Sequence, residues 1–479
     1  MNRLQLGEFH RFHAQGADYL YLVPSAAVFA LDPLAGAILD SLKAGPATMD
    51  SLRREMEATS FEQLIETVSE LLNVRALRYE GAPAEPAIKQ LPPETFPLST
   101  LVLNVTNQCN LSCTYCYEYG EDKIVDTENG KQAKFMSEAT ARESVDLLLA
   151  RSGKQAYLTF FGGETLLNFP VVRSTIAYAR ERFAAAGKRI EFSLTTNATL
   201  LREEIIEFLA GNDVGVTVSI DGPREMQDQF RVFHNGRGSY DVVEPKIREL
   251  LRRHRSRPIG ARVTLTSQTL DIRRIFRHLT AEIGFQEVGF APVTTAVNRL
   301  YSIGESGYDR MLDQFRELAY EWRDAMLEGR PHGFSNVRDT VEEIHKGVSK
   351  AYPCGAGLGL MGVSTEGEVG LCHRFAGSGE HRIGDVRTGI DTAAQREFLT
   401  RHHIDEKTDC SRCWARPLCS GGCYHEAHVR YGSTERANLH YCEWIRGWTG
   451  ICLEVYAAVA GMMNERNPEE VEVEASAIA

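Results

Sequence analysis

Long hydrophobic runs are missing from this chain of 479 residues. No apolar stretch approaches the roughly 18 residues that a membrane-spanning helix needs. The first ten residues, Met1–His10, also lack the apolar core of a secretory signal. We therefore expect a cytoplasmic protein that is not exported and has no membrane partner.

Positive charge is also scarce, because 53 Lys and Arg stand against 65 Asp and Glu and the net charge is −12. A protein that binds nucleic-acid phosphates needs a basic surface, so this balance argues against a nucleic-acid partner. The hydrophobic fraction of 43% and the charged fraction of 25% are those of an ordinary globular protein. The length predicts two to four domains.

Cysteine, in contrast, is plentiful. Eleven cysteines without an export signal indicate metal or redox chemistry in a reducing compartment rather than disulfides. Cys109, Cys113 and Cys116 stand in the run Cys-Asn-Leu-Ser-Cys-Thr-Tyr-Cys. A [4Fe–4S] cluster normally takes four cysteines, so three leave one iron open to a small molecule. The alternative is a structural zinc site, which needs a fourth Cys or His; His13 and His234 are the nearest histidines in sequence.

Between about residues 98 and 300, strand-like and helix-like segments alternate. The predicted strands are Thr100–Val105, Ala156–Phe161, Glu191–Thr195, Val214–Ile220, Ala261–Thr266 and Glu287–Val293. Helical stretches such as Glu138–Ala150, Val171–Ala184 and Val242–Arg253 lie between them. Six such alternations predict an α/β fold with a parallel sheet curled into a partial (β/α)6 barrel. The cysteine triplet follows the first strand, at the end where barrels carry their chemistry.

The remaining segments predict additional domains. Residues 1–85 combine short apolar runs with an amphipathic helix preceded by the capping box Ser60 and Gln63, which suggests a small winged-helix module. Five prolines between Gly81 and Pro97 indicate a linker at 86–97. The predicted later segments are a charged helical bridge at 301–350, a cysteine-rich domain at 351–463 and a disordered acidic tail at 464–479.

The CxxxCxxC spacing, with Tyr115 before the last cysteine, resembles the signature of radical S-adenosylmethionine (SAM) enzymes. The resemblance implies that SAM binds the open iron and is cleaved by one electron to methionine and a 5′-deoxyadenosyl radical. Besides Tyr115, it implies SAM contacts at Gly162, Gly163, Glu164, Asn197, Ser219 and Arg231. Two glycines let a backbone approach a ligand, and a carboxylate suits an ammonium group. Singly, these residues could also be strand-end turns, capping side chains or, for Arg231, an ordinary surface arginine.

The second cysteine group resembles the SPASM domain of peptide-modifying radical SAM enzymes. That domain carries two auxiliary iron–sulfur clusters, which we expect to be of the [4Fe–4S] type. The family's pattern implies that Cys354, Cys372 and Cys423 hold the first auxiliary cluster. It assigns the second to Cys410, Cys413, Cys419 and Cys442. A zinc ribbon would use four of these seven cysteines and leave three without a role. The first set lacks one ligand, which could be Cys452, another side chain or a substrate thiol; a buried structural role suits Cys452 in its apolar helix.

The residues around these cysteines resemble the family of maturases of quinohaemoprotein amine dehydrogenase. Cys372-His-Arg-Phe-Ala-Gly and Pro353-Cys-Gly-Ala-Gly carry the resemblance. It implies an enzyme that joins cysteine sulfur to side-chain methylenes of Asp or Glu in the small subunit of that dehydrogenase. Sulfatase maturases have a catalytic aspartate where this chain has His373, which argues against formylglycine formation. Other SPASM peptide modifiers, forming thioethers to α-carbons or carbon–carbon links, and a non-catalytic multi-cluster electron carrier are the alternatives.

The resemblance also implies partners and a base. A leader peptide would add a strand to residues 1–85, and an external flavodoxin or ferredoxin would supply electrons. A DNA-binding winged helix is disfavoured, because residues 1–90 hold eight Lys and Arg against twelve Asp and Glu. The attacking thiol must lose its proton, so a base beside the clusters is expected. The candidates are Asp409, His373 and Glu426, each of which could instead only support a metal ligand.

Overall fold

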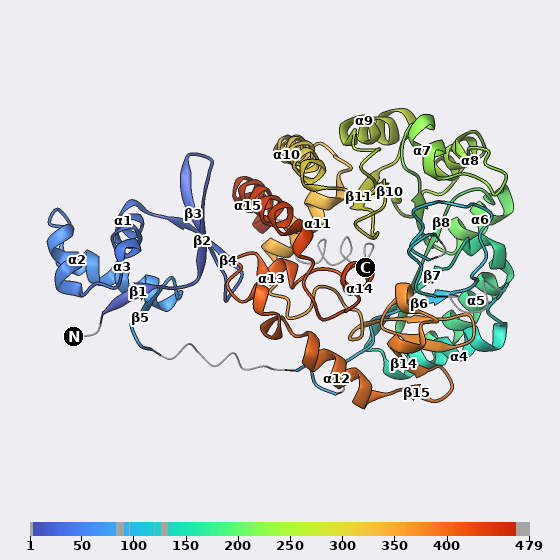
Figure 1. Cartoon of the computed structure of the whole chain (residues 1–479), viewed down its shortest axis with the longest axis horizontal. Helices are drawn as coiled ribbons and strands as arrows, with labels where there is room; N and C mark the ends of the chain where they lie inside the picture. Colours follow the sequence, from blue (N-terminus) through green and yellow to red (C-terminus); the bar gives the residue numbers. More distant parts are fainter. Residues whose placement is uncertain (1–2, 83–90, 95, 119, 126–132, 466–479) are drawn as a thin grey trace.

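The computed structural model describes residues 3–82, 91–94, 96–118, 120–125 and 133–465. Part of the predicted linker at 86–97 and nearly all of the predicted tail at 464–479 lie outside these residues. An N-terminal module lies at one end of the molecule, and the parallel sheet with its surrounding helices forms the larger body (Figure 1). Within the described residues, no helix has the length and apolar character needed to cross a bilayer.

The N-terminal module combines helices with antiparallel strands. Its helices are α1 (Pro33–Ser41), α2 (Met49–Glu55) and α3 (Phe61–Asn73). Strands β2 (Phe9–Ala14), β3 (Ala17–Leu22) and β4 (Ala27–Leu31) form a meander, while β1 (Leu4–Leu6) pairs with β5 (Leu77–Tyr79). Helix α3 begins after Ser60, whose hydroxyl oxygen accepts a hydrogen bond from the Gln63 backbone amide at 3.2 Å, as the capping box predicts. Its buried side chains Leu64, Val68 and Leu71 pack on α1.

Six parallel strands form the main body of the sheet. They are β6 (Thr100–Asn104), β7 (Gln155–Phe161), β8 (Arg189–Thr196), β9 (Gly215–Ser219), β10 (Ile259–Leu265) and β11 (Glu287–Pro292). They lie in chain order, each hydrogen-bonded in parallel to the next. The predicted α/β fold with a central parallel sheet is confirmed, and each strand ends within one or two residues of its predicted end.

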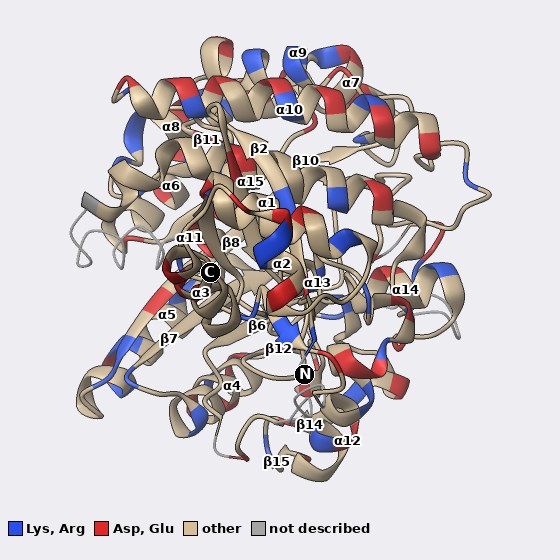
Figure 2. Ribbon diagram, turned by 90° about the vertical axis from the view of Figure 1, so that its left-hand side faces the viewer, with Lys and Arg blue, Asp and Glu red and all other residues tan. Residues whose placement is uncertain are grey.

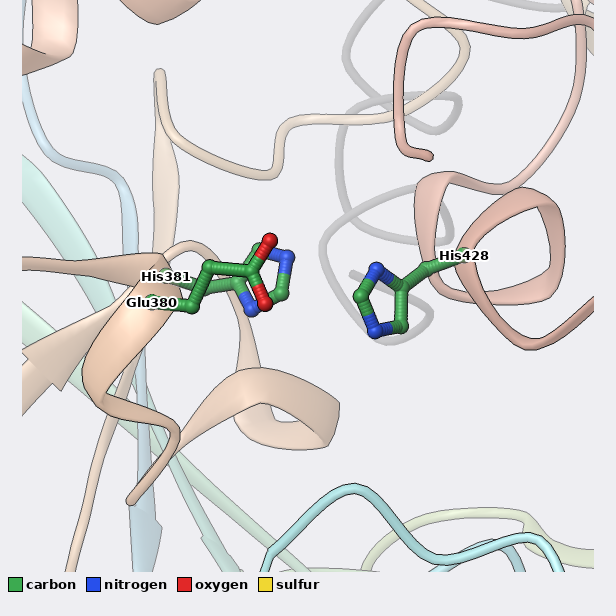
Figure 3. A group of neighbouring side chains, drawn as sticks. All are labelled: Glu380, His381 and His428. Carbon is green, nitrogen blue, oxygen red and sulfur yellow. The ribbon is translucent and has the colours of Figure 1, made fainter. Parts of the chain in front are cut away.

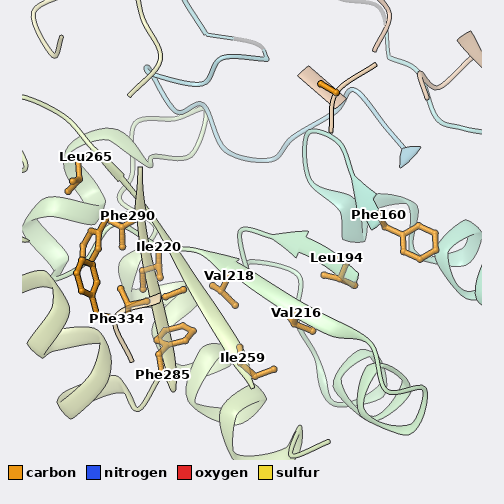
Figure 4. Close-up of a cluster of buried hydrophobic side chains, with 14 of the residues drawn as sticks. Phe160, Leu194, Val216, Val218, Ile220, Ile259, Leu265, Phe285, Phe290 and Phe334 are labelled. Carbon is orange, nitrogen blue, oxygen red and sulfur yellow. The ribbon is translucent and has the colours of Figure 1, made fainter. Parts of the chain in front are cut away.

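The strands alternate between two environments. Phe192, Leu194, Val216 and Val218 are almost fully buried, and Figure 4 shows such side chains packed together along the sheet. Their neighbours Ser193, Thr195, Thr217 and Ser219 instead line an interior cavity. Successive strand residues point to opposite faces, so the apolar positions pack against the helices and the polar positions face inward. The inner face is therefore a ligand cavity rather than an apolar core.

Helices surround the sheet and follow the predicted segments closely. Those of the barrel are α4 (Glu138–Arg151), α5 (Phe169–Ala185), α6 (Glu203–Gly211), α7 (Arg224–Phe230), α8 (Tyr240–Arg253) and α9 (Ile272–Arg277). Then come α10 (Glu305–Leu327), α11 (Ser335–His345), α12 (Thr392–His402), α13 (Arg416–Cys419), α14 (Tyr424–Tyr431) and α15 (Cys442–Glu465). Acidic and basic residues are interspersed along α9 and α10 (Figure 2), where Arg273 pairs with Glu317 at 2.5 Å.

The sheet does not stop at the barrel. Strand β12 (Leu360–Val363) pairs in parallel with the free edge of β6, and β13 (Glu368–Gly370), β14 (Arg382–Asp385) and β15 (Gly389–Ile390) continue in antiparallel order. The result is one sheet of ten strands. The cysteine-rich region is thus hydrogen-bonded into the barrel, an extension that sequence analysis did not predict.

Phe334 anchors the helical bridge against the barrel. Its side chain is fully buried and makes ring contacts with Phe276, Phe290, Phe315 and Trp448. Replacing it by Ala leaves a cavity, so we expect Phe334→Ala to reduce the unfolding free energy by about 3–5 kcal/mol. Thermal unfolding measures the loss. The control is Phe61→Ala, because Phe61 is 41% exposed; equal effects of the two changes would contradict the assignment.

Two buried histidines make stability depend on pH. Burial lowers the pKa of His381 and of His402 to about 4. An unfolded histidine titrates near 6.5, so between pH 4 and 6.5 the unfolded chain binds more protons. The stabilising contribution is therefore complete above pH 6.5 and is lost as the pH falls towards 4.

We expect the loss for each histidine to reach about 1.4 kcal/mol per pH unit within this window. Thermal unfolding at pH 5 and pH 7 tests this expectation in the wild type and in His402→Gln. The Gln side chain is polar but does not titrate, so the variant should have a shallower pH dependence. Identical pH dependences would show that His402 does not contribute.

Candidate functional site

A single cavity of about 640 Å³ occupies the inside of the barrel. Its lining includes the predicted cluster cysteines Cys109, Cys113 and Cys116. The predicted SAM-contact residues also line it: Tyr115, Gly162, Gly163, Glu164, Asn197, Ser219 and Arg231. His373 and Arg374, from the cysteine-rich region, line the same space. The cavity therefore joins the first cysteine set to the neighbourhood of Cys372.

The two glycines make room for the cysteine loop. A Cβ on Gly162 would lie 2.4 Å from the Thr106 carbonyl oxygen, and one on Gly163 would lie 2.2 Å from that of Gln108. The Gly163 and Glu164 amides donate to those two oxygens, at 2.9 and 2.8 Å. In this structure the glycine pair thus allows close approach of the protein's own loop, whereas sequence analysis explained it only by approach of a ligand.

Glu164 is buried and held by its surroundings. Its carboxylate accepts from the Thr196 hydroxyl at 2.7 Å and from the Asn197 and Leu166 amides at 2.7 and 3.0 Å. Burial nevertheless raises its pKa. Asn197 also reaches the cysteine loop, because its side-chain amide lies 3.6 Å from the Cys109 sulfur. Glu164 and Asn197 therefore connect the ends of β7 and β8 to the loop.

Tyr115, Asp221 and Arg231 form a buried network beneath the loop. The Tyr115 hydroxyl donates to the Asp221 carboxylate, and Arg231 donates to the Tyr115 oxygen at 3.0 Å. Burial opposes the charge on Arg231, but Tyr115, Cys113 and Asp221 raise its pKa above the usual value. Its Nε atom is buried without a partner. Arg231 is therefore an interior cation beside the cysteines, not a surface residue, and Asp221 is a site residue that sequence analysis missed.

The spacing of the cysteines distinguishes a cluster from a single ion. Among the described residues, the one group of three ligand atoms within 4.8 Å of one another is Glu380, His381 and His428 (Figure 3). In tetrahedral zinc sites, sulfur ligands about 2.3 Å from the ion lie roughly 3.8 Å apart. No cysteine set converges within that limit, which suits a larger iron–sulfur cluster. His234 does not complete a zinc site either, since its ring contacts the Cys109 carbonyl oxygen at 2.9 Å.

The other cysteines fall into two neighbourhoods. Cys423 and Cys354 both contribute to raising the pKa of Cys372 to about 12, after the larger effect of burial. Likewise, after burial, Cys419, Cys413 and Cys442 raise the pKa of Cys410 to about 11. Thiols this reluctant to ionise, packed side by side, suit bound metal, because a metal ion stabilises the thiolate.

Two further residues bear on the cysteine sets. The buried ammonium of Lys407 has no hydrogen-bond partner, and its charge interacts with Cys410, Cys419 and Cys354. It therefore lies where it can offset negative charge from both sets. Cys452 is fully buried in α15, where its thiol has a hydrogen-bond interaction with the Thr340 side chain. The structure thus places Cys452 against α11 rather than in either cysteine neighbourhood.

The candidate bases lie in three different settings. His373 lines the cavity, 4.7 Å from the Phe161 ring, and burial lowers its pKa to about 3. Asp409 is exposed beside Cys442 and is absent from the cavity lining. Glu426 is buried, 2.9 Å from the His440 ring nitrogen. The structure brings only His373 to the cavity.

Sequence analysis did not identify Glu118, Arg262 or Arg374, which also line the cavity. Two signals were available in the sequence. Glu118 and Arg374 each follow a cluster cysteine by two residues, and Arg262 is a charged residue inside the apolar strand Ile259–Leu265. A charge at an inward strand position costs free energy unless a ligand or counter-ion meets it.

Comparison with known proteins gives a consistent result. The family model of the Radical SAM superfamily matches residues 103–279. The cysteine-type anaerobic sulfatase-maturating enzyme of Clostridium novyi (strain NT) is 24% identical over 360 residues, which is 72% of this chain and 92% of that protein. The serine-type anaerobic sulfatase-maturating enzyme of Bacteroides thetaiotaomicron is 26% identical over 372 residues, which is 72% of this chain and 87% of that protein.

The solved structure of native anSMEcpe with bound AdoMet has a similar fold. Its TM-score is 0.65 at 21% identity, and the match covers 76% of this chain and all of that one. The half-buried cysteines of the loop and the buried Arg231 fit a negatively charged [4Fe–4S] cluster, and the cavity beside them accommodates SAM. The seven further cysteines fit auxiliary clusters. Residues 103–279 of this chain are therefore a radical SAM domain.

Proposed function

We propose that this enzyme forms thioether crosslinks in a peptide, joining a cysteine sulfur to a side-chain methylene of Asp or Glu. One observation carries the proposal: a single cavity extends from the Cys109–Cys116 loop to His373 and Arg374, next to Cys372. A peptide in this cavity would lie between the Cys109–Cys116 loop and the surroundings of Cys372. Such an arrangement suits a reaction that activates carbon at one end and binds a thiolate at the other.

The comparisons support a peptide or protein substrate. The structure of native anSMEcpe with bound AdoMet and Cp18Cys peptide holds a peptide, with a TM-score of 0.65 to this chain at 22% identity. The finer proposal follows the resemblance to maturases of quinohaemoprotein amine dehydrogenase, with that dehydrogenase's small subunit as substrate.

Making each carbon–sulfur bond removes two hydrogens from the peptide. When bound, the first cluster and SAM supply the one-electron chemistry that takes one hydrogen as an atom from carbon. The thiol loses the other as a proton, and one electron would leave through the cysteine-rich domain to an external electron-carrier protein. The chain's part is to hold the peptide, exclude water and accept the proton.

Glu118 and His373 are the proton acceptors nearest to this chemistry, because both line the cavity. The lowered pKa of His373 keeps its ring neutral at physiological pH, the state that accepts a proton, but a pKa of about 3 makes it a weak base. Glu118 is a buried carboxylate in the same lining and is the other candidate. Asp409, exposed beside Cys442, suits proton exchange with solvent near the second auxiliary set.

The N-terminal module offers an edge for a leader peptide. Strand β4 is the outer strand of the β2–β3–β4 sheet, and no described strand pairs with its far side. Phe29 on this strand is 44% exposed. An extended peptide could add there as a fourth strand, with backbone hydrogen bonds for affinity and Phe29 for an apolar contact. Strand β2, at the other edge, packs against α15.

Formylglycine formation is a second candidate, favoured by the similarity to sulfatase-maturating enzymes. The side chain after Cys372 argues against it, because the buried neutral ring of His373 stands where that family has a catalytic aspartate. The two reactions differ in their products, so a peptide assay separates them.

The assay uses anaerobically reconstituted enzyme with SAM, dithionite and a candidate peptide that contains Cys together with Asp and Glu. Thioether formation lowers the peptide mass by two hydrogens per crosslink, and fragmentation places the link on Cys and Asp or Glu. Conversion of Cys to formylglycine would show loss of sulfur instead. Release of 5′-deoxyadenosine without any peptide change would contradict both proposals for this substrate.

The cysteine loop itself is testable through Gly163. A Cβ there would collide with the Gln108 carbonyl oxygen at 2.2 Å, so we expect Gly163→Ala to displace the loop and prevent stable binding of the first cluster. Iron content should fall by about four atoms per chain, the content of one such cluster. Gly211→Ala is the matched control, because nothing lies within 4 Å of a Cβ at that position. Full iron content in Gly163→Ala would contradict this account of the loop.

A further inference from the structure

Arg262 is an interior cation that lacks a direct partner. It lies on β10, level with Ser219 on β9 and with Gly289 on β11. Its side chain is accessible to solvent, but the accessible surface faces the cavity and not the outside of the protein. Among the described residues, no side chain makes a hydrogen bond or ion pair with its guanidinium.

The missing Cβ of Gly289 gives Arg262 its room. A Cβ at Gly289 would lie 3.0 Å from Nη1 of Arg262. The guanidinium thus extends across β11 inside the barrel. An arginine placed this way has five donors directed at a space that only a ligand or water can fill.

Arg374 brings a second positive charge to the same cavity. It donates to the Thr294 hydroxyl at 3.0 Å and stacks over the Tyr117 ring at 4.3 Å. These contacts fix its position, and its charge also interacts with Cys423, Cys372 and Glu426. Burial, and then repulsion from Arg374, lower the pKa of Arg262. Two like charges in a cavity of low dielectric constant are costly, and an anion between them removes the cost.

Two other arginines of the cavity lining, Arg257 and Arg338, are already paired. Arg257 pairs with Glu191 at 2.8 Å and Asp213 at 2.9 Å. Arg338 pairs with Glu287 at 2.5 Å and Asp339 at 3.0 Å. Asp339 is also the acidic group whose field reaches Arg262, but its carboxylate is held by Arg338. Arg262 is therefore a cavity arginine that no described side chain pairs with, and Arg374 is the second cation whose charge reaches it.

We propose that Arg262 and Arg374 bind the carboxylate of an acidic side chain on the substrate peptide and so determine which residue is modified. The planar guanidinium fork matches a carboxylate, and bidentate pairing fixes its orientation. Holding the carboxylate also fixes the methylene next to it within the cavity that the Cys109–Cys116 loop lines. This inference rests on the proposed function only in that a peptide enters the cavity.

A binding experiment tests this without requiring a crosslink. Reconstituted enzyme with SAM is presented with a displayed library of random 12-residue peptides that each contain one cysteine. We expect the wild type to enrich Asp and Glu over Asn and Gln about tenfold at one spacing from the cysteine, as charged hydrogen bonds predict. Arg262→Gln should lose this preference, and Arg262→Lys should keep part of it.

Arg257→Gln is the matched control, because its guanidinium lines the same cavity but is already paired; it should keep the preference. No acidic preference in the wild type, or an undiminished preference in Arg262→Gln, would overturn the proposal. The methionine carboxylate of SAM is the other possible anion. A loss of SAM affinity in Arg262→Gln, by calorimetry, with acidic preference intact would assign the arginine to SAM and also overturn it.

The outcome is independent of the proposed function. If acidic peptides are enriched but no enriched peptide loses two hydrogens, the binding site stands and thioether formation fails. If crosslinks form on peptides without acidic preference, the reaction stands and the carboxylate site fails.

Discussion

The parallel pairing of β12 with β6 determines the relation between the two halves of the active site. Strand β6 leads directly into the Cys109–Cys116 loop, and β12 leads through β13 to Cys372 and His373. Four register pairs, from Leu360 opposite Thr100 to Val363 opposite Leu103, fix the distance between these segments. The Asn104 side-chain amide also donates a hydrogen bond of 3.1 Å to the His373 carbonyl oxygen. Because strand pairing has a fixed spacing, Cys372 cannot move away from the barrel without breaking the edge of the sheet.

Along the strands of this sheet, side chains that pack against the helices alternate with side chains that line the cavity. Outward residues such as Val216 and Val218 supply the apolar contacts with the helices, while inward residues remain polar. A barrel filled with apolar side chains would be more stable, since every inward charge costs desolvation. This chain instead keeps Arg231, Glu164 and Arg262 inside. Neighbouring groups form hydrogen bonds with Arg231 and Glu164, whereas no described side chain forms one with Arg262. The cost is tolerated where a cofactor or substrate compensates for it, which is why the unmet charge marks a binding surface.

Much of this could be read from the sequence, because strand periodicity and the cysteine spacings are local features. The strands from Thr100 to Pro292 and helix α3 with its Ser60 cap follow from patterns a few residues long. The pairing of β12 with β6 joins residues about 260 positions apart, and no local pattern encodes it. The role of Gly163 depends on the position of the Gln108 carbonyl oxygen. The importance of Arg262 depends on the lack of a hydrogen-bond or ion-pair partner among the described side chains. Such properties arise from tertiary placement.

The cysteine-rich region also positions the N-terminal module. His10 on β2 stacks on Trp414 at 3.7 Å, and Glu8 pairs with Arg416. Both partners lie in the short segment between Cys413 and Cys419, which has little regular structure of its own apart from α13. A segment this short keeps its shape through whatever its cysteines bind, because metal ligation couples to local folding. Docking of the module, and with it the direction in which β4 would deliver a peptide, therefore depends on this segment together with the packing of β2 against α15. Under the proposed function, peptide recognition and electron transfer would share this structural support.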